Sequence, residues 1–360
     1  MYSTSYLLLQ AMTAVAVGDA LGVPVQFTDR PTLLKNPVDQ MIGNGAFDVP
    51  AGTWSDDTSL TLATLASLSQ GFNLDDMMMR YRQWYDFGDY TPFGKSFDIG
   101  QTTQRAINRY KHGVPPEKCG GATESDNGNG SLMRVMPLAF YLLSQFPNYR
   151  FNSDVANICE RFSSLTHRHP RSLLATSILV NVTTTVILSP NKYAMLKSIR
   201  EVLDYYQELP KFKDEIKYFN QMDDPSYYRK PNSEVQSSGY VIDTLNSVFW
   251  CLMNSEKYVS AVKKAVNMGN DSDTIASITS MLGSLLYAPV SFPPEWAVLL
   301  KGKTHIKWAV ALALQTTYFD SKRVSIDKRL KPFLLNKNSS DKQNIFVLIF
   351  GSIHCFNYHT

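Results

Sequence analysis

Two short acidic segments, far apart in the 360-residue chain, carry the residue types needed for metal chemistry. They are Ser55-Asp56-Asp57-Thr58 and Asp271-Ser272-Asp273-Thr274. Each precedes an apolar run of helical period, so each is expected in the first turn of a helix. For either segment alone the simplest interpretation is helix capping, because Ser and Asp side chains accept hydrogen bonds from the free N–H groups there.

Capping needs one residue, whereas each segment offers two carboxylates and a neighbouring hydroxyl. These oxygen donors form a hard ligand set that suits Mg²⁺, Mn²⁺ or Ca²⁺ better than zinc. An EF-hand is disfavoured, because the second segment continues into an apolar helix without the glycine and glutamate of that loop. If the two helix starts face each other, a two-metal site with an activated water follows. The pairing of the two starts is a hypothesis.

Four further sites with polar or glycine residues are expected in loops or at helix starts. Residues 128–131 (Gly-Asn-Gly-Ser) precede an apolar helix expected to begin at Leu132, where backbone N–H groups could cradle an anion; a flexible turn is the plainer alternative. Asp98 precedes another helix and is most simply a cap. His167 falls on a turn, where a structural histidine is commoner than a catalytic one. Tyr240 opens a helix and could be a core residue or stack on a base, with core favoured.

The elements that would position these residues are predicted to be helices. Apolar residues recur with helical spacing, and runs of alternating period are few, so we expect an all-α domain with long functional loops. The helices are expected at 5–17, 60–68, 132–144, 154–165, 171–188, 193–207, 240–253, 256–267 and 275–286. The polar stretch 208–239 is predicted to be an exposed insertion. Residues 1–318 would form one domain, with 319–360 an appendage to which the sequence assigns no role.

The composition excludes several classes of protein. With 44% hydrophobic and 19% charged residues the chain can bury a sizeable core, and global disorder is excluded. Lys and Arg total 35 against 32 Asp and Glu, a net charge of +3 that makes a nucleic-acid partner unlikely.

The cysteines and the apolar runs suggest a compartment. None of the four cysteines forms a CxxC pair, so a reducing, cytoplasmic environment is expected. The apolar N-terminus lacks the basic region of a signal peptide, and Asp19 stands where a cleavage site would be wanted. No apolar run is expected to reach the roughly 18 to 20 residues that span a bilayer, so no membrane partner is predicted.

The order of the motifs is more specific than any one of them. They run Gly18-Asp19-Ala20-Leu21-Gly22, Gly52-Thr53-Trp54-Ser55-Asp56-Asp57, Phe97-Asp98-Ile99-Gly100, Gly128-Asn129-Gly130-Ser131, Leu165-Thr166-His167, Gly239-Tyr240-Val241 and Gly269-Asn270-Asp271-Ser272-Asp273-Thr274. This series, over roughly residues 5 to 300, resembles the ADP-ribosylglycohydrolase family. The final Asp-x-Asp-Thr block is its most specific piece.

The resemblance implies a compact orthogonal helical bundle with two divalent cations, Mg²⁺ or Mn²⁺. It also implies hydrolysis of the glycosidic bond between ADP-ribose and an acceptor, in an ADP-ribosylated protein or a small ADP-ribosyl substrate. By position, the metal ligands would be Ser55, Asp56, Asp57, Asp271, Asp273 and Thr274. The substrate would be held by Gly128, Asn129, Gly130, Ser131, His167, Tyr240, Gly269 and Asn270, with Asp98 and Asp57 as the catalytic residues.

One position departs from the family pattern. Gln26 stands where the family frequently has a glutamate that is associated with the metal site. Glutamine keeps a carbonyl oxygen but supplies neither negative charge nor a base. The alternative function is therefore a catalytically impaired ADP-ribose-binding protein, or an immunity protein that neutralises an ADP-ribosyltransferase toxin.

Overall fold

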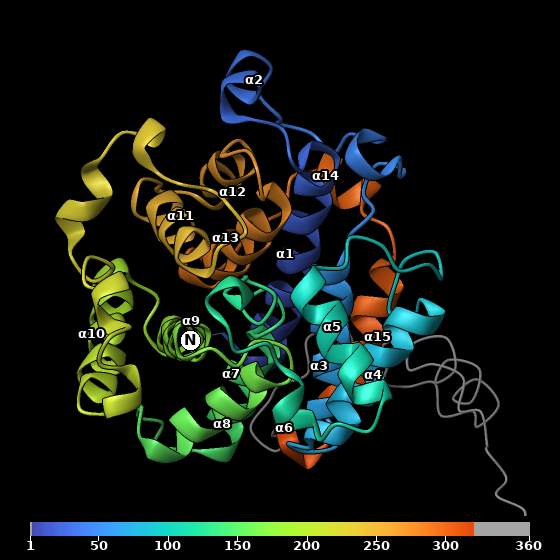
Figure 1. Cartoon of the computed structure of the whole chain (residues 1–360). Coiled ribbons are helices and arrows are strands. Elements are labelled where there is room, and N and C mark those ends of the chain that lie inside the picture. The colour runs from blue at the N-terminus through green and yellow to red at the C-terminus, as the bar shows by residue number, and fades with distance from the viewer. Residues whose placement is uncertain (1, 320–360) are drawn as a thin grey trace, which may run out of the picture.

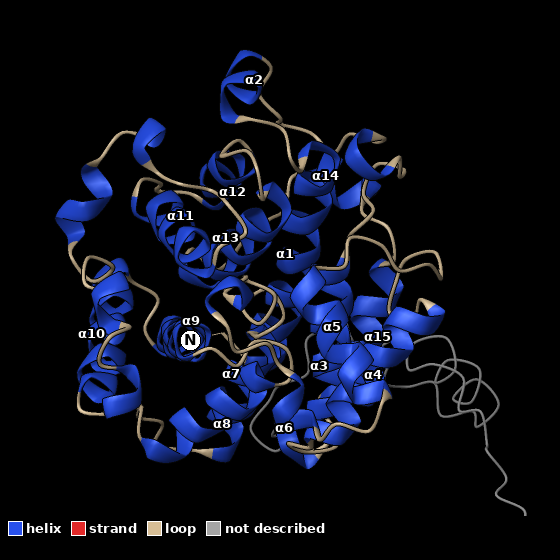
Figure 2. Cartoon of the chain, in the orientation of Figure 1, coloured by secondary structure: helices blue, strands red, loops and turns tan. Residues whose placement is uncertain are grey.

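The computed structural model describes residues 2–319, and within this range the protein is all-α, with isolated β-bridges and no strand (Figure 2). The α-helices are α1 (Thr4–Gly22), α2 (Arg30–Lys35), α3 (Asp56–Leu68), α4 (Leu74–Phe87), α5 (Gln101–Lys111), α6 (Pro116–Cys119), α7 (Met136–Gln145), α8 (Ser153–Ser164), α9 (Pro170–Leu188), α10 (Lys192–Gln207), α11 (Val241–Met253), α12 (Tyr258–Val266), α13 (Ser272–Leu286), α14 (Pro294–Leu299) and α15 (Lys303–Ala313). The 3-10 helices are η1 (Val23–Val25), η2 (Gly45–Phe47), η3 (Glu124–Asp126), η4 (Pro210–Phe212), η5 (Ile216–Tyr218), η6 (Pro225–Arg229), η7 (Asn232–Glu234) and η8 (Thr317–Phe319). The prediction of an all-α fold is confirmed.

Helices α1 and α13 pack against each other at the centre of the molecule (Figure 1). Two glycines of α1 allow their backbones to approach closely. A Cβ at Gly18 would lie 2.2 Å from the Ala276 carbonyl oxygen, and one at Gly22 would lie 2.3 Å from the Asp273 Cα. Since no side chain fits there, the glycines fix the position of the first turn of α13, which carries the second acidic segment.

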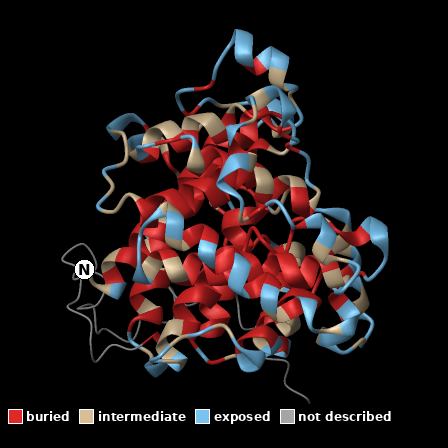
Figure 3. Ribbon diagram, turned by 90° about the vertical axis from the view of Figure 1, so that its left-hand side faces the viewer, coloured by how far each residue is buried: buried red, intermediate tan, exposed pale blue. Residues whose placement is uncertain are grey.

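Buried residues run through the middle of the bundle, and exposed residues lie at its periphery (Figure 3). Helices α1 and α9 are buried nearly all around. Both are long and apolar enough to cross a membrane, which corrects the expectation that no run reaches that length. However, 94% and 83% of their apolar windows are buried inside the protein, as expected for core helices. Cys119, Cys159 and Cys251 are buried and free.

Helix α7 begins at Met136 and not at Leu132, which corrects one predicted boundary. Residues 129–135 form successive turns instead, in which the Asn129 carbonyl accepts the Leu132 N–H at 2.7 Å. Pro137, in the first turn of the helix, favours a start there because proline needs no N–H partner. The Gly-rich loop is therefore not at a helix N-terminus, and an anion cradle of that kind is excluded at α7.

The insertion 208–239 is only partly exposed, which corrects a second expectation. It forms η4 to η7 along the outer side of α10 and α11 (Figure 1). Five of its apolar side chains are buried, namely Phe212, Phe219, Met222, Tyr228 and Val235. Spaced irregularly among polar residues, they show no helical period, so sequence periodicity could not detect them. The predicted appendage lies outside the described residues, apart from the buried Phe319.

Candidate active site

An acidic pocket of about 490 Å³ opens where the first turns of α3 and α13 meet. Its volume lies in the range of small-ligand sites. Among its lining residues are the four carboxylates Asp56, Asp98, Asp271 and Asp273, together with Thr274. The structure thus brings the two acidic segments together although they are more than 200 positions apart in the chain. A direct contact joins them, because the Thr274 hydroxyl donates to Asp57 Oδ1 at 3.4 Å.

The clustered carboxylates are buried and repel one another. Burial first, and then the neighbouring carboxylates, raise the pKa of Asp56, Asp57 and Asp273 well above the usual range. Asp57 Oδ2, Asp273 Oδ1 and Asp98 Oδ2 are buried without a hydrogen-bond partner. In residues 2–319 no three His, Cys, Asp or Glu side chains are close enough to count as a preformed metal site. Unpartnered buried carboxylate oxygens of this kind nevertheless fit divalent cations, which would offset their charge.

Capping explains only part of the acidic segments. The Ser55 hydroxyl accepts the Asp57 N–H at 3.4 Å at the start of α3, whereas Asp271 begins α13 without a side-chain capping bond. Instead, Asp271 Oδ2 accepts a short hydrogen bond from the Asn129 amide, which also donates to the Thr244 hydroxyl at 2.9 Å. Asn129 therefore orients a pocket carboxylate and does not itself act as a helix-end anion site.

Asp19 positions the first acidic segment, a role that the sequence analysis missed. It lies fully buried in α1 and caps α3, with Oδ1 accepting the Ser55 N–H at 2.9 Å and Oδ2 accepting the Thr58 N–H at 3.0 Å. Desolvation raises the pKa of Asp19 to about 6, while its bonds to Thr58 and Ser55 oppose the shift. The available signal was a lone carboxylate inside an otherwise apolar helix, since such a group needs a buried partner.

Asp98 is not the helix cap that its position suggests. Gly100 occupies the N-cap of α5, while Asp98 has a left-handed backbone with φ 61° and faces the pocket. Its Oδ1 accepts the Gln26 side-chain amide at 3.3 Å, and its other oxygen has no partner. Desolvation raises the pKa of Asp98 to about 7, which suits a group that exchanges protons near neutral pH.

His167 borders the glycine loop and is buried at 2% exposure. A Cβ at Gly130 would lie 2.8 Å from the imidazole Cε1, so glycine permits the close approach of the ring. The ring Nδ1 is hydrogen-bonded to the Thr166 hydroxyl at 2.8 Å. Burial lowers the pKa of His167 to about 3, helped by the nearby Arg134, so the imidazole is neutral.

Several predicted substrate residues do not line the pocket. Ser131 is fully buried and bonds the Thr176 hydroxyl at 3.0 Å. Gly269 and Asn270 support the loop of residues 26–28, since the Asn270 carbonyl accepts the Phe27 N–H at 2.7 Å. Conversely, Arg105 lines the pocket and was missed; its guanidinium donates to Asp126 at 2.9 Å and brings a positive charge to the pocket lining. A basic residue in the helix that follows Asp98 was the available signal.

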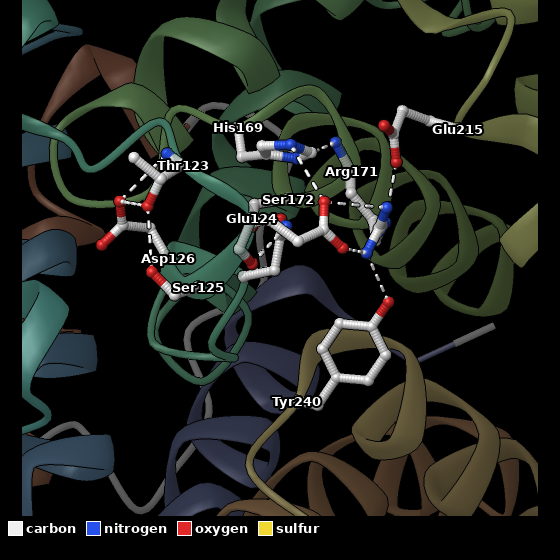
Figure 4. A network of polar contacts seen from close by, with 10 residues as sticks. Thr123, Glu124, Ser125, Asp126, His169, Arg171, Ser172, Glu215 and Tyr240 are labelled. Carbon is white, nitrogen blue, oxygen red and sulfur yellow. Dashed lines mark hydrogen bonds and ion pairs between the residues drawn. The ribbon is translucent and has the colours of Figure 1, made fainter.

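Tyr240 lies outside the pocket lining and is held by Arg171 (Figure 4). The Arg171 guanidinium, 3% exposed, donates to the Tyr240 hydroxyl at 2.8 Å and to Glu215 Oε2 at 2.7 Å. It also pairs with Glu124, close to the glycine loop, and lies 3.6 Å from the Tyr218 ring centroid. This network ties the insertion, α9 and the start of α11 to one rim of the site (Figure 4).

Taken together, the all-α bundle and its buried acidic pocket agree with the family that the order of the motifs indicates. The sequence profile of the ADP-ribosylglycohydrolase family matches residues 7–321, and the chain belongs to this family. It is 29% identical to the ADP-ribosylarginine hydrolase Tri1 of Serratia proteamaculans, over 79% of this chain and 73% of that protein. It is 25% identical to the ADP-ribosyl-[dinitrogen reductase] glycohydrolase of Rhodospirillum rubrum, over 80% and 88%. A solved structure titled as an ADP-ribosylglycohydrolase-related protein complex aligns with a TM-score of 0.69 and 27% identity, over 88% of this chain and 98% of that one.

Proposed function

We propose that the protein removes ADP-ribose from arginine side chains of modified proteins, with two Mg²⁺ or Mn²⁺ ions in the acidic pocket. The observation that carries the proposal is the convergence of Asp56 and Asp57 with Asp271 and Asp273, with buried oxygens left unpartnered. The arginine acceptor is suggested by the relatives named ADP-ribosylarginine hydrolase.

In this proposal Asp56, Asp57, Asp271, Asp273 and Thr274 hold the ions, with Ser55 as a further hydroxyl donor. Bound divalent cations would orient the ribose hydroxyls and lower the pKa of a water. The chain itself performs the remaining tasks.

Asp98 is placed to move the proton. With one oxygen held by Gln26 and the other free, it can pass a proton to the departing guanidine nitrogen and take one back from the water that adds to the ribose carbon. The pocket carboxylates would favour the positive charge that develops on that carbon. Gly128, Gly130 and Arg105 also line the pocket, and a diphosphate there would find backbone and one cation.

Release of free ADP-ribose from an ADP-ribosyl-arginine peptide tests the proposal. Chelation with EDTA is expected to abolish release, and Mn²⁺ or Mg²⁺ added back should restore it. Turnover that persists after exhaustive chelation contradicts the metal assignment.

Gln26 favours a second candidate, a binding-only protein, because glutamine supplies no base at this position. Tight binding of ADP-ribose by calorimetry, with no release from arginine or serine adducts at any metal concentration, would select that candidate.

A further inference from the structure

Three aromatic side chains form a row beside the acidic pocket, and we call Phe27, Phe47 and Phe97 the aromatic row. Phe27 lines the pocket and is 69% exposed. Its ring centroid lies 6.2 Å from that of Phe47, whose centroid lies 5.2 Å from that of Phe97. The three residues come from separate segments, after η1, in η2 and before α5. Phe47 and Phe97 are half-buried, so Phe27 is the member of the row that is exposed at the pocket and can meet a ligand there.

The row is held in place by its backbone. Phe27 has φ 66°, a strained value for a bulky residue, and is kept there by the 2.7 Å hydrogen bond from its N–H to the Asn270 carbonyl. Segment η2 is locked against η1, since a Cβ at Gly45 would lie 1.9 Å from the Pro24 carbonyl oxygen. Strain that exposes an aromatic ring to solvent gains nothing for stability, so it points to a functional role.

Both ends of the aromatic row adjoin, in the sequence, a residue that lines the acidic pocket. Phe27 directly follows Gln26, and Phe97 directly precedes Asp98. The Gln26 amide donates to Asp98 Oδ1 at 3.3 Å and so links the two ends. Aromatic faces next to carboxylates attract a planar cation, through the ring quadrupole and through charge. A hydroxyl acceptor such as serine would gain neither interaction.

We propose that the aromatic row is the acceptor subsite and that it selects a guanidinium leaving group over a hydroxyl one. This inference rests on the proposed function, because it requires an ADP-ribosyl substrate in the acidic pocket. The guanidinium of the modified arginine lies against Phe27 with Asp98 beside it. Phe47 packs against Phe27, Phe97 packs against Phe47, and both contact the residues that flank the arginine.

The test compares Phe27→Leu and Phe47→Leu with Phe87→Leu as the control. Phe87 ends α4, is also 69% exposed and is no part of the pocket lining. For ADP-ribosyl-arginine peptide, kcat/KM should fall about 3- to 30-fold in Phe27→Leu, as the loss of one cation–π contact predicts, and by a smaller factor in Phe47→Leu, which removes only the support of Phe27. For ADP-ribosyl-serine peptide, and for the affinity for free ADP-ribose, all variants should stay within about twofold of wild type.

Equal loss on both peptides, or no loss on either, overturns the acceptor subsite while leaving the proposed function intact. If wild type releases ADP-ribose from neither peptide, the proposed function fails. Equilibrium binding of the two peptides then tests the acceptor subsite by itself. A preference of wild type for the arginine peptide that Phe27→Leu removes supports the subsite. Equal affinity of wild type for both peptides overturns it.

Discussion

Asp273 illustrates how single residues of the site are balanced between stability and chemistry. It is 1% exposed, its Oδ1 has no hydrogen-bond partner, and burial followed by Asp271 and Asp98 raises its pKa well above the usual range. Such a group destabilises the metal-free fold, since an uncompensated buried charge costs several kcal/mol. Its retention makes sense only if a cation or substrate offsets the charge.

Asp273→Asn should therefore raise the free energy of unfolding of the EDTA-treated protein by about 1 kcal/mol or more at pH 8. The same substitution should lower release of ADP-ribose at least 10-fold and reduce the rise of Tm on adding Mn²⁺. Urea unfolding, calorimetry and product assays measure the three quantities. Asp204→Asn, at an exposed position on α10, should change none of them. A metal-free variant less stable than wild type would contradict the repulsion argument.

At the scale of elements, the close approach of α1 and α13 sets the position of the second acidic segment. The contact depends on two positions that have no side chain, Gly18 and Gly22. Because α1 also carries Asp19, which caps α3, one helix aligns both acidic starts. The geometry of the pocket is thus a consequence of how α1 packs.

Gly22→Ala should destabilise the protein by about 1 to 3 kcal/mol, because its Cβ would lie 2.3 Å from the Asp273 Cα and the backbones must separate. Urea denaturation measures the change. Gly283→Ala is the matched control: it also lies within a helix, and an added Cβ would come no closer than 3.6 Å to its nearest neighbour. If both variants unfold at the same urea concentration, close packing is not what limits position 22.

A second element-scale feature is the Arg171 network, which positions the rim formed by Glu124, Tyr240 and the insertion (Figure 4). Arg171→Lys keeps the positive charge, but a lysine ammonium lacks the planar guanidinium that donates to Glu124, Glu215 and Tyr240 at once. The KM for an ADP-ribosyl peptide should rise about 5-fold or more, with kcat within about twofold, because the network holds Tyr240 next to Gly239, which lines the pocket, and contains none of the residues proposed to act in the chemistry. Arg161→Lys, at an exposed ion pair with Glu117, should leave both constants unchanged. A fall in kcat at constant KM would contradict a positioning role.

At the scale of the whole molecule, stability depends on pH because some buried groups have different pKa values in the folded protein and in the unfolded chain. The pKa of His167 falls from 6.5 to about 3 on folding, because burial disfavours the imidazolium. As the pH falls, the imidazole is therefore protonated in the unfolded chain before it is protonated in the folded protein. This stabilises the unfolded chain progressively as the pH drops below 6.5.

Between pH 8 and pH 5, the free energy of unfolding should fall by about 2 kcal/mol more in wild type than in His167→Gln. The difference between the two urea midpoints, followed across this range, isolates the contribution of His167 from that of the carboxylates. A constant difference would show that the imidazole titrates normally in the fold.

The sequence by itself determined the all-α class, most helix locations and both acidic segments. These features are local: an apolar stripe recurs every three or four residues, and Ser or Asp stands at a helix start. The order of the motifs was also sufficient to indicate the ADP-ribosylglycohydrolase family, which the comparisons confirm.

Only the tertiary structure decided which residues meet. Thr274 reaches Asp57 across 217 positions, and Asp19 caps a helix 36 positions away, pairings that no local pattern specifies. It also placed Ser131 away from the pocket and tied Tyr240 to Arg171. The physical reason is that a buried polar group takes whichever partner the packed helices bring near, and that partner depends on the whole core and not on neighbouring residues.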